Sequence, residues 1–176
     1  MKRLFISATI LFCFLSFNAF TQQGMKQAKN ETSDQPYKVQ YTKISIGNPS
    51  HTQKVLWAWK YYDNNTLDKA SDFFAEDVVA TLPDGTMIKG KDNFLKAMKD
   101  YRNSIASVVS EVAACTTLKT ADDPEHEVVS IWGVETDTQK DGTVTKTHLN
   151  EVWFFNKDGK VVEFHQLAAK DAAEKK

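Results

Sequence analysis

The chain has 176 residues, of which 41% are hydrophobic and 26% are charged, and its formal net charge is -1. This length and composition suit one soluble domain and are short for two. The near-zero charge gives no electrostatic reason to expect nucleic acid, because proteins that bind it carry a clear basic excess. With 7 Gly and 4 Pro, a collagen-like or low-complexity chain is excluded.

The amino terminus has the layout of a secretory signal. Lys2 and Arg3 are followed by an apolar run from Leu4 to Phe17, which is short for a membrane span. We therefore expect residues 1–21 to be a signal peptide that is cleaved on export. The mature protein is then periplasmic or extracellular, with no attachment to a membrane. An uncleaved anchor is the alternative interpretation of the same run.

Cleavage would also remove Cys13 and leave Cys115 as the one cysteine of the mature chain. A single cysteine forms no internal disulfide, so the exported domain must depend on its hydrophobic core. No activating motif surrounds Cys115, which favours a small buried side chain over a nucleophile.

Residues 22–49 precede the predicted folded domain. The part up to Pro36 is polar and poor in aliphatic side chains, which predicts a flexible tether. Residues 37–46 alternate between apolar and polar side chains with one change of phase, which indicates an extended stretch. The folded domain is expected over residues 50–169, and a polar tail follows at 170–176.

The first half of this domain combines helices with one hairpin. A capping box at Ser50 and Gln53 predicts a first helix that ends at Asn64-Asn65, and Thr66 can cap a second, short helix. A β-branched run at 78–82 can return as a hairpin through 86–89. A third helix is indicated by an apolar stripe at helical spacing, formed by Phe94, Met98, Tyr101 and Ile105.

The second half reads as sheet throughout. Strands are predicted over residues 108–118, 127–139, 143–155 and 160–168. The dipeptides Asp141-Gly142 and Asp158-Gly159 are hairpin turns between the later strands. Three helices followed by a long antiparallel meander indicate an α+β domain in which the helices cover one face of the sheet.

Five short motifs occur in a characteristic order. They are Asn64-Asn65-Thr66-Leu67-Asp68, Phe73-Phe74-Ala75-Glu76-Asp77-Val78, Leu82-Pro83-Asp84-Gly85, Lys89-Gly90-Lys91 and Asn156-Lys157-Asp158-Gly159-Lys160-Val161. In this order they resemble the NTF2-like superfamily, and within it the SnoaL-like branch of polyketide cyclases and ketosteroid isomerases. The resemblance, over residues 50–168, implies a cone of three N-terminal helices on a curved antiparallel sheet around an apolar pocket, often in a homodimer. The same fold hosts enzymes, ligand binders and interaction modules.

The hairpin turns predict a register for the last three strands. A two-residue turn at Asp141-Gly142 would place Trp132 opposite Glu151, and a three-residue loop at 157–159 would place Glu151 opposite His165. Because side chains alternate between faces, one face is expected to carry Trp132, Val134, Leu149, Glu151, Trp153 and His165. The other face is expected to carry Val129, Ile131, Val152, Phe154, Val162 and Phe164.

Both faces are apolar near the carboxy-terminal hairpin, which a sheet with one solvated face would not show. One face must meet the helices, and the other meets a second copy most simply. We therefore expect a homodimer through the face with Ile131, Val152, Phe154 and Phe164, and a pocket on the other face.

The predicted neighbours Glu151 and His165 are the candidate catalytic residues. A carboxylate beside an imidazole raises the pKa of the histidine and orients its ring, so the pair can move protons in a cavity that excludes water. A purely structural buried ion pair is the alternative. Glu135 is expected opposite His148 near the hairpin tip, in contact with solvent.

The ketosteroid isomerase pattern is only partly present. The resemblance implies a general-base aspartate at the position of Leu82, an oxyanion tyrosine near Ala58 and a second acid at Glu151. Leu82 cannot take a proton, so steroid isomerisation of that type is not expected. Tyr61 and Tyr62 are candidates to replace the missing donor.

The other pocket candidates are aromatic or aliphatic: Tyr61, Phe74, Leu82, Met98, Trp132 and Trp153. The four histidines are scattered and no nucleotide-binding motif occurs, so we expect neither a metal nor another cofactor. The favoured hypothesis is an exported domain that binds a small apolar or aromatic molecule. The alternatives are an acid–base isomerase, cyclase or dehydratase, and an interaction module whose cavity is filled.

Overall fold

The computed structural model describes residues 36–171. The expected signal peptide and residues 172–176 of the expected tail lie outside the described residues. All helices and strands of the described residues belong to the compact unit that begins at Val39. None of these helices is long and apolar enough to cross a membrane.

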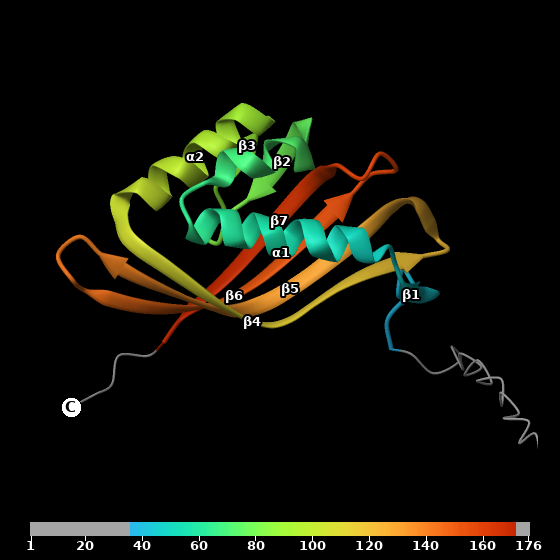
Figure 1. Ribbon diagram of the computed structural model, residues 1–176. Helices are drawn as coiled ribbons and strands as arrows, with labels where there is room; N and C mark the ends of the chain where they lie inside the picture. Colours follow the sequence, from blue (N-terminus) through green and yellow to red (C-terminus); the bar gives the residue numbers. More distant parts are fainter. Residues whose placement is uncertain (1–35, 172–176) are drawn as a thin grey trace, which may run out of the picture. The chain divides into compact units, whose positions relative to one another are not determined.

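The unit is one curved sheet with its helices on a single face (Figure 1). In chain order the elements are β1 (Ile44–Ile46), α1 (Pro49–Asp63), the 3-10 helix η2 (Leu67–Phe73), β2 (Phe74–Thr81), β3 (Met87–Lys89), α2 (Lys91–Ser104), β4 (Ile105–Thr120), β5 (Asp123–Gln139), β6 (Val144–Phe155) and β7 (Val161–Lys170). The strand order is β1-β4-β5-β6-β7-β2-β3.

The α+β class is confirmed, and two details of the predicted arrangement are wrong. The sheet is mixed rather than antiparallel, because β2 pairs in parallel with β7. Only one α-helix, α1, precedes the β2–β3 hairpin. The segment 67–73 forms a 3-10 helix because β2 begins directly after it at Phe74, and the third predicted helix, α2, follows the hairpin.

Local sequence explains the two ends of α1. The side chain of Asn48 accepts a hydrogen bond from the Ser50 amide at 3.0 Å, and Pro49 occupies the first turn, where its missing N–H costs nothing. The cap is therefore Asn48, and not the predicted box at Ser50 and Gln53. The helix ends as expected, with Asn65 in a left-handed conformation at φ 55°.

The core lies between the helices and the sheet. Val55, Ala58 and Trp59 of α1 and Phe94 of α2 pack against the buried side chains of the central strands. These strand residues are Val129, Ile131, Leu149, Trp153, Phe155 and Phe164. Ile131 and Phe164 therefore belong to the helix-covered face, so their predicted place in a dimer interface is wrong.

The register differs from the predicted one at two places. The turn between β5 and β6 has three residues, because the Gln139 amide bonds to the Thr143 carbonyl at 2.7 Å, and Glu151 consequently lies opposite Ile131. The loop at 157–159 has the predicted length. A β-bulge beyond it shifts β7 by one residue, so Glu151 lies opposite Gln166.

The extended stretch predicted at residues 37–46 forms a strand only over its last three residues. This strand, β1, pairs antiparallel with β4 at the edge of the sheet, where Ile46 lies opposite Leu118. The sheet therefore begins before residue 50, where the folded domain was expected to start.

Candidate functional site

A cavity of about 560 Å³ lies between the helices and the covered face of the sheet. α1, α2 and the strands β5, β6 and β7 all contribute to its lining. Most of the lining is apolar, and the polar side chains gather toward the hairpin end of β5.

One wall of the cavity is a ring of four aromatic side chains. Phe74 contacts Phe94 and Trp153 with centroid distances of 5.2 and 5.9 Å. Phe164 closes the ring at 5.4 Å from Phe94 and 4.9 Å from Trp153. All four are buried, and tilted or edge-to-face contacts of this kind hold such rings in place.

Glu151 connects this wall to α1. Its Oε2 accepts hydrogen bonds from the indole N–H groups of Trp59 at 2.6 Å and Trp153 at 3.0 Å. Its Oε1 accepts one from the Gln166 amide at 2.8 Å. Burial raises the pKa of this carboxyl, and the three hydrogen bonds act in the opposite direction because they favour the ionised form.

A second carboxyl, that of Glu135, lines the polar end beside Tyr62 and Tyr101. Burial raises the pKa of Glu135 to about 8, and the negative charges of Asp137 and Glu151 act in the same direction. Burial likewise raises the pKa of the Tyr62 hydroxyl. At neutral pH both groups are therefore protonated, and each can donate a hydrogen bond into the cavity.

A buried carboxyl and a buried guanidinium, those of Asp137 and Arg102, lie behind this end and outside the cavity lining. Burial raises the pKa of Asp137, and its Oδ2 accepts a long hydrogen bond from Tyr101 at 3.4 Å. The Arg102 guanidinium donates to the carbonyls of Tyr62 at 3.1 Å, Asp63 at 3.0 Å and Ile105 at 3.4 Å. Arg102 therefore fixes the end of α1 to the start of β4.

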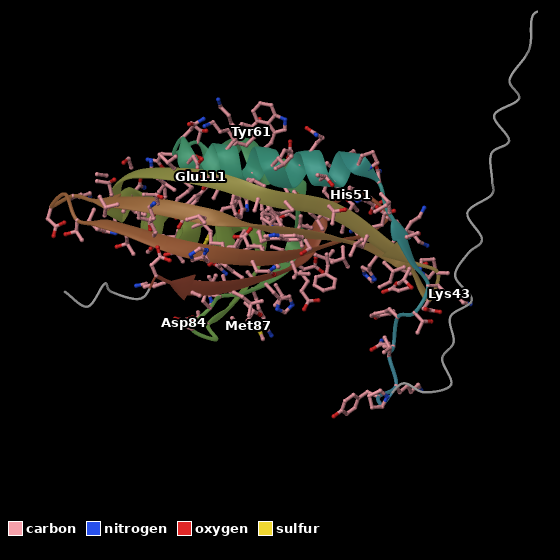
Figure 2. The ribbon with its side chains drawn as sticks, turned by 90° about the horizontal axis from the view of Figure 1, so that it is seen from below. Lys43, His51, Tyr61, Asp84, Met87 and Glu111 are labelled. Atoms are coloured by element: carbon pink, nitrogen blue, oxygen red, sulfur yellow. The ribbon has the colours of Figure 1, made fainter. Side chains whose placement is uncertain are left out.

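The structure brings five of the eight predicted site residues to the cavity. These are Glu151, Phe74, Leu82, Met98 and Trp153. Tyr61 does not line it and stacks on Trp57 at 5.5 Å instead, on the side of α1 that faces away from the strands (Figure 2).

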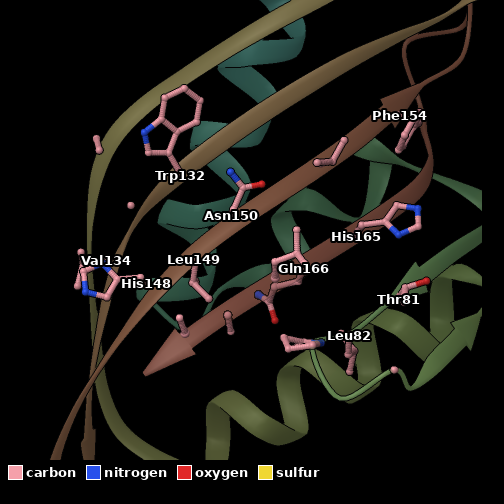
Figure 3. A pocket seen from close by; sticks show the side chains of 18 residues that line it. Thr81, Leu82, Trp132, Val134, His148, Leu149, Asn150, Phe154, His165 and Gln166 are labelled. Carbon is pink, nitrogen blue, oxygen red and sulfur yellow. The ribbon is translucent and has the colours of Figure 1, made fainter. Parts of the chain in front are cut away.

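His165 and Trp132 lie on the opposite face of the sheet (Figure 3). His165 contacts Glu163 at 2.6 Å, and not Glu151, and the Trp132 side chain is 43% exposed. The predicted Glu151–His165 pair does not form, because the bulge turns His165 outward. Both residues line a shallow groove on the uncovered face together with Val134, Val152, Phe154 and Leu167.

Sequence reasoning missed Trp59, Glu135 and Tyr101 as cavity residues. Trp59 is buried on α1, and a buried indole N–H needs an acceptor. Glu135 was expected opposite His148 in solvent, whereas it lies opposite Thr147 on the covered face. Glu135 lies two residues from both Gly133 and Asp137, so strand alternation places all three on one face of β5. This alternation was the available signal in the sequence.

Cys115 is partly buried against the core, and burial raises the pKa of its thiol to about 11. Such a thiol is a poor nucleophile at neutral pH. Within residues 36–171 no three His, Cys, Asp or Glu side chains are grouped so that they could hold a metal ion.

The fold and cavity define an NTF2-like α+β domain. The model of the SnoaL-like domain family matches residues 58–164, and the chain belongs to this family. No curated protein matches the chain.

Solved structures agree on the fold. A proposed SnoaL-like polyketide cyclase from Shewanella denitrificans has a TM-score of 0.57 at 12% identity, covering 69% of this chain and 92% of its own. A proposed scytalone dehydratase from Novosphingobium aromaticivorans has a TM-score of 0.57 at 11% identity, with coverages of 69% and 85%. A SnoaL-like protein of unknown function from Burkholderia thailandensis has a TM-score of 0.51 at 16% identity, with coverages of 71% and 99%.

Replacement of Glu151 by leucine is expected to destabilise the fold. It leaves the N–H groups of Trp59, Trp153 and Gln166 buried without an acceptor, at a total cost of about 3 kcal/mol or more. Glu151→Gln is the matched control, because its amide oxygen can still accept from both indoles. Urea unfolding should show a clearly smaller loss for the control. Equal losses for the two variants would contradict this role of the carboxylate.

Glu135→Gln is expected to stabilise the protein mainly at higher pH. Because the pKa of Glu135 is raised in the folded state, ionisation of this group lowers the free energy of unfolding. This loss is absent below the unfolded pKa of about 4.3, grows as the pH rises, and is complete above about pH 8. The gain in melting temperature from the variant should therefore be small at pH 5 and larger, by a few degrees, at pH 8.5. The exposed Glu111→Gln serves as control, and a gain that is the same at both pH values would contradict the assignment.

Proposed function

We propose that this domain binds a small apolar or aromatic molecule in the cavity between its helices and sheet. The observation that carries the proposal is the cavity itself, whose volume of about 560 Å³ falls within the usual range for small-molecule sites. Its combination of an apolar lining and a few polar groups at one end is typical of such sites. A cavity of this size argues against an interaction module with a filled core.

A second candidate function is acid–base catalysis centred on Glu135. It is favoured by a protonated carboxyl with a pKa of about 8 that lies in the cavity beside the Tyr62 hydroxyl. A general acid is most effective when its pKa is near the working pH. Isomerisation, cyclisation and dehydration all use such a group. This candidate replaces the chemistry expected of Glu151 and His165, which lie on different faces.

Two further parts of the proposal concern location and assembly. The apolar run near the amino terminus supports export with cleavage of residues 1–21.

The uncovered face of the sheet supports a homodimer, because the groove on it is lined by the apolar side chains of Trp132 and Phe154 (Figure 3) and of Leu167. Trp132 and Leu167 are 43% and 62% exposed, and apolar surface left exposed on one face is typical of interaction surfaces. The proposed interface keeps Val152 and Phe154 from the sequence-based expectation and replaces Ile131 and Phe164.

Filling the cavity should abolish ligand binding without unfolding the protein. Ala97 of α2 lines the cavity, so Ala97→Phe places a phenyl ring inside it. The neutral aromatic dye prodan should bind wild type with a blue-shifted emission, and its affinity should fall at least tenfold in the variant. Ala106→Phe is the matched control at an exposed position outside the cavity. Absence of prodan binding to wild type, or equal binding to Ala97→Phe, would contradict the proposed pocket.

The proposed dimer predicts that a charge on the uncovered face yields monomers. Leu167 is 62% exposed in one protomer, so Leu167→Asp should leave the fold intact while placing a carboxylate in the interface. Val144→Asp is the matched control, because Val144 is 58% exposed and lies outside the groove. Size-exclusion chromatography with light scattering should give a dimer mass for wild type and the control, and a monomer mass for Leu167→Asp. A monomeric wild type at micromolar concentration would exclude this interface.

A further inference from the structure

We propose that the polar end of the cavity binds the cationic group of a small aromatic or apolar amine or quaternary ammonium, with the Glu135 carboxylate as its counter-ion. The ligand class rests on the proposed function of the cavity as a binding site.

Carboxyl groups outnumber cationic groups around this end of the cavity. Four carboxyl groups act on one another there: Asp63 of α1, Glu135 and Asp137 of β5, and Glu151 of β6. The cations that face them within the described residues are Arg102 and Lys170. The N–H groups of Arg102 are directed to three backbone carbonyls. Lys170 lines the cavity at the end of β7, where it is exposed to solvent.

Within the described part of the chain, the hydrogen bonds at this end leave the Glu135 side chain and one oxygen of Asp137 without a partner, and of these two residues Glu135 lines the cavity. Asp63 accepts from Ser110, and Glu151 accepts from its three partners. Glu135 has no hydrogen-bond or ion-pair partner among residues 36–171 and lines the cavity. Asp137 is only 4% exposed, and its Oδ1 also has no partner among the described residues. A buried carboxylate without a partner is costly, and an ammonium N–H in the cavity would donate to Glu135, whereas a quaternary ammonium, which has no N–H, would act on Glu135 through its charge alone.

The rest of the lining fits the remainder of such a ligand. Trp59, Tyr62 and Tyr101 surround the polar end, and aromatic faces attract cations. Phe74 and Leu149 offer apolar surface for a hydrocarbon body. A carbonyl ligand is the competing case: the indole N–H groups of Trp59 and Trp153 are already directed to Glu151, but protonated Glu135 and the Tyr62 hydroxyl can donate to a carbonyl oxygen.

A cation beside Glu135 must also displace its proton. The pKa of about 8 keeps this carboxyl neutral at pH 6, and a neighbouring positive charge lowers that pKa and releases the proton. The affinity for a cation that does not itself titrate should therefore rise between pH 6 and pH 8.5. The rise is about tenfold or more if only the carboxylate binds the cation.

The experiment measures displacement of prodan by three probes of similar size: phenyltrimethylammonium, its neutral isostere tert-butylbenzene, and acetophenone. In wild type at pH 8.5 the cation should bind at least tenfold tighter than the isostere. In Glu135→Gln its affinity should fall about tenfold, while that of tert-butylbenzene stays unchanged. Glu111→Gln removes the same charge from an exposed position of β4 and should have no effect (Figure 2).

The remaining outcomes overturn the inference in distinguishable ways. If tert-butylbenzene or acetophenone binds as tightly as the cation, the site is a pocket for neutral molecules, and the proposed function stands without the cation. If the cation binds equally well to Glu135→Gln, or its affinity does not rise with pH, Glu135 is not the counter-ion. If neither prodan nor any probe binds wild type, the proposed function fails as well.

Discussion

The buried carboxylate of Glu151 is the interaction on which the geometry of the site depends. It accepts hydrogen bonds from Trp59 of α1, Trp153 of β6 and Gln166 of β7, and so connects the helix with two strands. Each of these N–H groups would be buried without a partner if the carboxylate were absent. The Trp59–Glu151 hydrogen bond joins α1 to the sheet, and the other two bridges hold the carboxylate on β6 and β7, so the helix is not placed by apolar packing alone. The cavity lies directly beside these bridges.

Sequence patterns could predict the elements but not all of their pairings. The stop at Asn64-Asn65, the β2–β3 hairpin, α2 and the four long strands all follow from short stretches of chain, where propensity and turn chemistry act. The parallel contact of β2 with β7 joins residues such as Ala80 and Phe164, which are far apart in the sequence and are not connected by a hairpin turn. Parallel partners need long connections and leave no local signal, so the sheet was expected to be antiparallel.

The sequence could predict which strands form the candidate site, but it could not fix their pairing register to within one residue. Glu151 and Trp153 were placed correctly with the pocket, because both alternate with Val152 on the same strand. Trp132 and His165 were not, because an Asp-Gly dipeptide fits a turn of two or three residues equally well, and because the bulge in β7 needs no glycine to mark it. A one-residue shift moves every side chain of a strand to the other face. The same shift hid Glu135, which the expected register had left in solvent.

The carboxyl groups at the polar end of the cavity lower the stability of the fold when they ionise. Glu135 and Asp137 lie within the influence of Asp63 and Glu151, and burial removes the water that would otherwise screen their charges. For stability alone, neutral side chains of similar size would serve better at Glu135. Charge interactions are strongest where water is excluded. The carboxyl groups that lower the stability of the protein are therefore also the groups that would discriminate most sharply between a charged and a neutral ligand. Stability and selectivity are therefore opposed at Glu135, and the surrounding aromatic core must supply the packing that holds the carboxyl in place.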